Sequence, residues 1–172
     1  MQNFVLRLAL ILGLIVTLSS CAEKTSYVVA HQSAGGEIQL SDLTKAKHYF
    51  KRVLENAKIQ DELSNFEIVS IPNDTGKALQ LLRAHTSAKN VYIAIEVFEG
   101  ENGEIGITSA SLTQGVLICN TSCTEGCLPV KSKGQWSCSN QCNQGSGCQE
   151  IITRAYEENN YTTPIQAFLE KY

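Results

Sequence analysis

The sequence CNTSCTEGCLPVKSKGQWSCSNQCNQGSGC, residues Cys119–Cys148, holds six of the seven cysteines of the chain. Their spacing is Cys-x3-Cys-x3-Cys-x10-Cys-x3-Cys-x5-Cys, which divides them into two groups of three. The seventh cysteine, Cys21, stands alone near the amino terminus. The covalent state of the six clustered cysteines therefore decides how this part of the chain folds.

The first 20 residues predict an export signal. Arg7 and the amino terminus form a short basic start, and an unbroken run of apolar and small residues extends from Leu8 to Leu18. A membrane-spanning helix needs about 20 apolar residues, so this run is too short to span a bilayer and suits a signal peptide. We therefore expect residues 1–20 to be absent from the mature fold.

The signal ends in the tetrapeptide LSSC at residues 18–21. It resembles the lipobox of bacterial lipoprotein precursors, a resemblance that covers residues 1–21. It implies that Cys21 is linked to diacylglycerol, that the signal is cut off just before it and that the new amino terminus is acylated. Such an anchor is stable, since two or three acyl chains hold a protein where one does not. Ala22 favours the outer membrane, because aspartate at this position favours retention in the inner one. The alternative is an ordinary secretory signal with an incidental cysteine.

Length and charge exclude some classes of function. The chain of 172 residues is long enough for one packed domain, and its formal net charge is −3. A mildly acidic chain without a basic run is a poor candidate for nucleic-acid binding. Residues 21–40 contain the flexible sequence SAGG and are expected to form a lipid-anchored tether, with one short strand at Tyr27–Ala30.

Residues 41–118 predict an α+β domain that begins with an amphipathic helix, with Ser41 as its N-cap and Asp42 favouring its first turn. Its apolar stripe recurs at intervals of three and four: Leu43, Ala46, Tyr49, Phe50, Val53, Leu54 and Ala57. The opposite arc is basic: Lys45, Lys47, Lys51, Arg52 and Lys58. Such a face can contact anionic headgroups in a membrane-tethered protein, and it also fits an ordinary solvated helix face.

The rest of this domain predicts a second helix and several strands. Residues 66–71 favour a strand that ends at Pro72, and a helix is expected over Lys77–His85. Clean alternation over Val91–Phe98 predicts a strand that turns at 100–103 and returns over 105–112. A last buried strand is expected at 116–118.

Residues 149–172 are expected to dock on the core as a strand and a short helix. Residues 151–156 favour the strand. Thr163, Pro164 and Gln166 have the elements of a helix start, namely a capping threonine, a proline at the first helical position and the partner of a capping box.

Three disulfides best explain the cysteines of residues 119–148. An exported chain meets an oxidising compartment, and six is an even number once Cys21 carries lipid. The segment is rich in turn formers and cannot order itself by burial, so bridges worth ~2–4 kcal/mol each would stabilise a disulfide-rich loop module. Fifteen pairings are open, and we expect bridges between the two groups rather than within a Cys-x3-Cys unit. The six residues are Cys119, Cys123, Cys127, Cys138, Cys142 and Cys148.

Metal binding and thiol redox chemistry are the alternatives for the same six cysteines. Zinc and iron–sulfur sites usually space cysteines by two residues rather than three, although soft thiolates suit copper(I) or zinc. A thioredoxin-like site needs Cys-x2-Cys at a helix start, which the segment lacks. We therefore expect no cofactor.

No catalytic constellation stands out elsewhere. The three histidines are scattered, and lone histidines usually sit in solvent or in a satisfied core: His31, His48 and His85. Four glutamates near the hairpin turn are best explained as solvated: Glu96, Glu99, Glu101 and Glu104. Trp136 is expected to pack on a disulfide.

These features together predict an α+β envelope lipoprotein with two helices on a small antiparallel sheet. Its expected role is non-enzymatic, as a membrane-anchored binding or structural component that meets an envelope protein or a small ligand. The alternative is an envelope metal-binding or thiol-redox protein that uses the cysteines.

Overall fold

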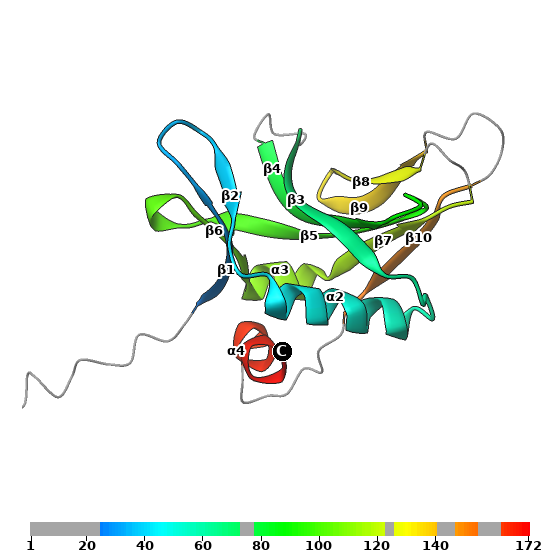
Figure 1. The fold of residues 1–172 in the computed structure, drawn as a ribbon. Helices are drawn as coiled ribbons and strands as arrows, with labels where there is room; N and C mark the ends of the chain where they lie inside the picture. The colour runs from blue at the N-terminus through cyan, green and yellow to red at the C-terminus, as the bar shows by residue number, and fades with distance from the viewer. Residues whose placement is uncertain (1–24, 73–77, 123–125, 141–146, 155–162) are drawn as a thin grey trace, which may run out of the picture.

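The computed structural model describes residues 25–72, 78–122, 126–140, 147–154 and 163–172. Within these ranges the chain is mainly β-structure, with eight strands in one curled antiparallel sheet shaped like half a barrel (Figure 1). The sheet strands are β1 Ser26–Gln32, β2 Ile38–Leu40, β3 Leu63–Pro72, β4 Ala78–Thr86, β5 Val91–Glu99, β6 Glu104–Thr108, β7 Val116–Asn120 and β10 Gln149–Thr153. A separate hairpin is formed by β8 Cys127–Ser132 and β9 Gln135–Asn140.

Strand β5 is the centre of the sheet and was predicted almost to its ends. It pairs with β4, β6 and β7, while β1 and β2 extend the sheet beyond β6 and β10 extends it beyond β7. Side chains of a strand alternate between two faces, and β5 is buried on both. We call these the helix face and the hairpin face, after the elements that cover them.

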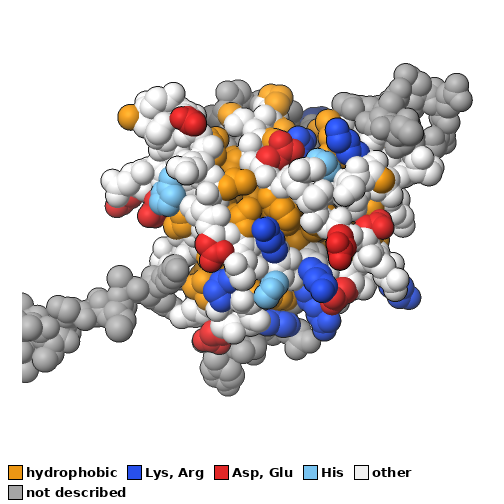
Figure 2. Space-filling view, viewed as in Figure 1, with side chains coloured by type: hydrophobic (Ala, Val, Ile, Leu, Met, Phe, Trp, Pro, Cys, Tyr) orange, Lys and Arg blue, Asp and Glu red, His pale blue; other side chains and the backbone are white. Residues whose placement is uncertain are grey.

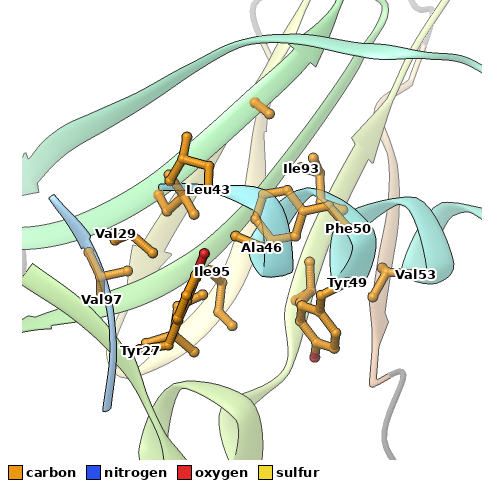
Figure 3. Packing of buried hydrophobic residues seen from close by; sticks show 14 of the residues in the cluster. Tyr27, Val29, Leu43, Ala46, Tyr49, Phe50, Val53, Ile93, Ile95 and Val97 are labelled. Atoms are coloured by element: carbon orange, nitrogen blue, oxygen red, sulfur yellow. The ribbon is translucent and has the colours of Figure 1, made fainter. Parts of the chain in front are cut away.

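The helix face carries the main hydrophobic core (Figure 3). The helix α2, Thr44–Asn56, lays its predicted apolar stripe against Ile93 and Ile95 of β5. The short helices α3, Ser109–Gln114, and α4, Pro164–Lys171, close the same core, where Phe168 is fully buried. Aromatic rings pack against one another there: the centroid of the Phe168 ring lies 5.5 Å from the ring centroids of both Tyr27 and Tyr49.

The hairpin face carries a second, smaller hydrophobic cluster. The β8–β9 hairpin lies across this face of β5 and β7, and it buries Leu81, Tyr92, Leu117 and Trp136. The helices cover one face of β5 and the hairpin covers the other, so all residues of β5 from 91 to 97 are buried, Glu96 included. Two layers thus stabilise one central strand.

The predicted α+β class is wrong, because the second predicted helix is the strand β4. Leu81 and Leu82 are both fully buried, yet Leu81 belongs to the hairpin-face cluster and Leu82 to the helix-face core. A strand buried on both sides loses the alternation that identifies strands, so its apolar run resembles a helix stripe. Pairing with β3 and β5 then overrides the helix preference of its leucines and alanines.

Three other predicted segments also differ. Residues 26–40, expected to belong to the tether, form the β1–β2 hairpin, and β1 pairs with β6 over Ser26–His31. Part of the expected loop module, residues 127–140, forms the β8–β9 hairpin instead. The strand expected over 105–112 stops at Thr108, which caps α3 by accepting a hydrogen bond from the Ser111 amide.

The start of α4 is confirmed. The Thr163 hydroxyl accepts from the amide of Gln166, whose side-chain oxygen accepts from the Thr163 amide in return at 2.9 Å. The start of α2 is shifted from the prediction. Asp42, rather than Ser41, accepts hydrogen bonds from the first helical residue, Thr44, through its carboxylate. These hydrogen bonds, from the hydroxyl and the amide of Thr44, lower the pKa of the Asp42 carboxyl.

None of the helices among the described residues is both long enough and apolar enough to cross a membrane.

Candidate binding groove and cysteine pairs

Four of the six clustered cysteines are paired in the structure. Cys119 of β7 is bonded to Cys138 of β9, and Cys127 of β8 to Cys148, with Cα–Cα distances of 5.7 and 5.9 Å. Both bridges join the first group of three cysteines to the second, and together they fasten the hairpin to the sheet. Cys21, Cys123 and Cys142 lie outside the described residues.

These bridges also limit the chemistry of the site. A cysteine in a disulfide has no thiolate to offer a metal, so Cys119, Cys127, Cys138 and Cys148 are not metal ligands in this state. In the part of the chain that the structure describes, no group of three or more His, Cys, Asp or Glu side chains could hold a metal ion.

A buried ion pair fastens the same hairpin. Lys131 of β8 donates from Nζ to Glu96 Oε2 of β5 at 2.6 Å and to Gln114 Oε1 of α3. The side chains of Lys131 and Glu96 are 11% and 7% exposed, so the expectation of a solvated Glu96 is wrong. Glu96 falls on the hairpin face of β5, where the hairpin covers it. Trp136 lies in the hairpin-face cluster with Cys119 and Cys127, and Lys131 sits 5.2 Å from its ring centroid.

An open groove of about 1050 Å³ lies between α2 and β3. One wall is the exposed side of α2, and the other is the first part of β3 with the connection that leads into it; Leu40 of β2 stands at the amino-terminal end of α2. Figure 2 shows hydrophobic side chains gathered in a hollow here, with Lys and His side chains along it. The apolar lining comes from Leu40, Leu43, Leu54, Ile59, Leu63 and Phe66.

The floor of the groove is fixed by aromatic packing. Phe66 stacks on Phe50 with ring centroids 6.0 Å apart, which joins β3 to the buried side of α2. Lys47 lies over the same Phe66 ring, with Nζ 5.5 Å from its centroid. Leu40 remains 38% exposed, one of the two large hydrophobic side chains in the described chain that are exposed. The groove therefore presents apolar surface beside cations.

The charges of the groove are divided along its length. Lys47 and Lys51 lie one turn apart on α2, and within the described residues neither forms an ion pair. Glu55, further along α2, is paired with Arg52 at 3.1 Å. The acidic side chains Asp61 and Glu62 lie beyond the end of α2. The cations Lys47 and Lys51 thus lie along the α2 wall, and the end beyond α2 combines Lys58 with Asp61 and Glu62.

The histidines do not form a catalytic group in the described chain. His48 lines the groove and is exposed, and His31 is exposed on β1. His85 is buried on β4, where its Nδ1 lies 2.7 Å from the Thr86 carbonyl oxygen and its ring packs on Tyr92.

Comparison with known proteins adds no relative. No protein-family model, curated protein or solved structure matches the chain. Its function has to be inferred from its own residues, and the groove between α2 and β3 is the candidate site.

Proposed function

We propose that this protein is a lipid-anchored binding protein of the bacterial cell envelope, held through Cys21 and taking a ligand in the groove between α2 and β3. The observation that carries the proposal is the open apolar surface beside Lys47 and Lys51, which form no ion pair with any described residue, and Leu40 is 38% exposed there. Soluble domains normally cover such contiguous apolar surface unless it binds something. The floor is shaped by Phe50 and Phe66, so it exists before a ligand arrives.

The cellular address is supported by two independent features. The LSSC tetrapeptide ends an export signal, and Ala22 favours the outer membrane. The two disulfides fit an oxidising compartment, because structural disulfides are rare in the cytosol. An anchored binding component of the envelope accounts for both features.

The anchor has a direct test. Changing Cys21→Ala should abolish incorporation of labelled palmitate and leave uncut precursor in the membrane fraction, because the lipid attaches to this sulfur. Labelling of the wild-type chain and cleavage before residue 21 are measured together by autoradiography and intact mass. Persistent labelling of the Cys21→Ala variant would show that the lipid sits elsewhere and would remove this part of the proposal.

The groove has a separate test with a matched control. The chain from residue 22 onward, exported without a lipobox so that its disulfides form, should bind the apolar anion anilinonaphthalene sulfonate. Leu40→Glu should weaken this binding about tenfold, since a charge at the floor costs the apolar contact roughly one such factor. Ile152→Glu is the control, because Ile152 is 49% exposed on β10 and does not line the groove. Equal binding by the two variants would disprove a ligand site in the groove.

A further inference from the structure

The charge of this protein is distributed unevenly. The chain as a whole has a formal net charge of −3, yet α2 carries four Lys or Arg residues and one Glu. Three of the four cations are exposed on the outer side of the helix, namely Lys47, Lys51 and Arg52. An exposed cationic surface attracts anionic partners even when the net charge of the domain is negative.

The cationic end of the groove lies close to the point where the chain enters the fold. The Tyr27 hydroxyl donates to the Asp42 carbonyl oxygen and accepts from the Lys45 amide at 3.3 Å. The beginning of β1 therefore sits against the first turn of α2, and Lys47 follows within that turn of helix. Cys21 precedes Ser26, the first residue of β1, by five residues, which cannot reach further than about 18 Å at ~3.6 Å per residue.

A lipid on Cys21 would thus hold the amino-terminal end of α2 near the bilayer surface. Anionic lipids attract lysines at such a surface by about a fivefold gain in binding for each charge. The same end of the groove offers Leu40, Leu43 and Phe66 as apolar contacts beside Lys47. One groove therefore offers lysines that can contact an anionic headgroup and, next to them, apolar side chains that can contact an acyl chain.

We propose that the groove takes an anionic phospholipid from the membrane that holds the anchor. The acidic headgroup lies at Lys47 and Lys51, and an acyl chain lies along Leu40, Leu43 and Phe66. The headgroup is placed at Lys47 and Lys51 rather than beyond the end of α2, where Asp61 and Glu62 lie beside Lys58 and would repel it. The inference rests on the proposed function and narrows its ligand to one chemical class.

The test uses the full lipidated protein in vesicles made of equal parts phosphatidylglycerol and phosphatidylcholine. One of the two lipids carries a diazirine on its acyl chain, and cross-linked peptides are mapped by mass spectrometry. Cross-links should fall within residues 40–66 and favour the phosphatidylglycerol probe at least about fivefold. The double variant Lys47→Glu/Lys51→Glu should lower the phosphatidylglycerol signal at least about tenfold, since both headgroup contacts are reversed.

The matched control is Lys89→Glu, which reverses an exposed lysine in the β4–β5 turn outside the groove and should leave the labelling unchanged. The inference is overturned by equal labelling from the two lipid probes, by cross-links confined to other segments, or by full labelling of the double variant. These results would leave the proposed function intact if Leu40→Glu still weakens anilinonaphthalene sulfonate binding and Ile152→Glu does not. Loss of that difference would instead remove the groove as a site for any ligand.

Discussion

Replacing Glu96 by methionine is expected to lower the free energy of unfolding by about 3–5 kcal/mol, because it leaves the ammonium of Lys131 buried without its counter-charge. Lys131 Nζ lies 2.6 Å from Glu96 Oε2, and both side chains are almost fully buried between the β8–β9 hairpin and the sheet. Lys131 also donates to Gln114 Oε1, but a neutral amide oxygen compensates a buried charge only in part. Lys131→Met should cost a similar amount, since it strands the carboxylate of Glu96 instead.

The double variant Glu96→Met/Lys131→Met separates the ion pair from simple packing. It removes both charges and fills their volume with apolar atoms, so it should cost less than either single change. Urea unfolding followed by the fluorescence of Trp136, the one tryptophan of the chain, reports the hairpin, and circular dichroism reports the sheet. Additive effects of the two single changes would mean that the charges are not coupled.

Local signals in the sequence were sufficient wherever a segment meets the core on one side only. The apolar stripe of α2 and the capping residues of α4 were identified because each helix buries one face and leaves the other in solvent. The central strand β5 was also identified, since its β-branched residues alternate with smaller and polar ones. Its burial on both faces was not foreseen, and Glu96 was misplaced for that reason.

The error over β4 and the cysteine segment has one physical origin. Both depend on the β8–β9 hairpin, which folds back over the sheet and creates a second buried face far from it in sequence. Long-range contacts of this kind leave no local period, so Ala78–Thr86 resembled a helix and the cysteine segment resembled an unstructured loop.

The groove was only partly predictable. The basic arc of α2 was visible from its spacing, including Lys47 and Lys51. The apolar surface beside this arc could not be predicted, because Leu40 and Phe66 come from strands that precede and follow α2 in the chain. The curl of the sheet brings them together. A site formed by tertiary contacts needs the fold before its lining residues can be named.

The paired change Cys119→Ala/Cys138→Ala is expected to lower the free energy of unfolding by about 3 kcal/mol. The bridge closes a loop with a sequence separation of 19, and the chain-entropy estimate for a loop of this size is about 3 kcal/mol. Both cysteines are removed together, so the variant leaves no orphan thiol at this position. Cys119 is fully buried in β7, and two alanines leave a small cavity that adds to the loss.

The pair Cys127→Ala/Cys148→Ala provides the comparison, because its sequence separation of 21 predicts nearly the same entropic term. If the bridges act mainly by restraining the unfolded chain, the two double variants should unfold at similar urea concentrations under non-reducing conditions. If the Cys119–Cys138 bridge acts by holding the hairpin on the sheet, its loss should also raise the exposure of Trp136 before the sheet unfolds. Unchanged unfolding of either variant would mean that its bridge is absent in the native protein, while the ion pair of Lys131 and the apolar contacts of the hairpin would remain.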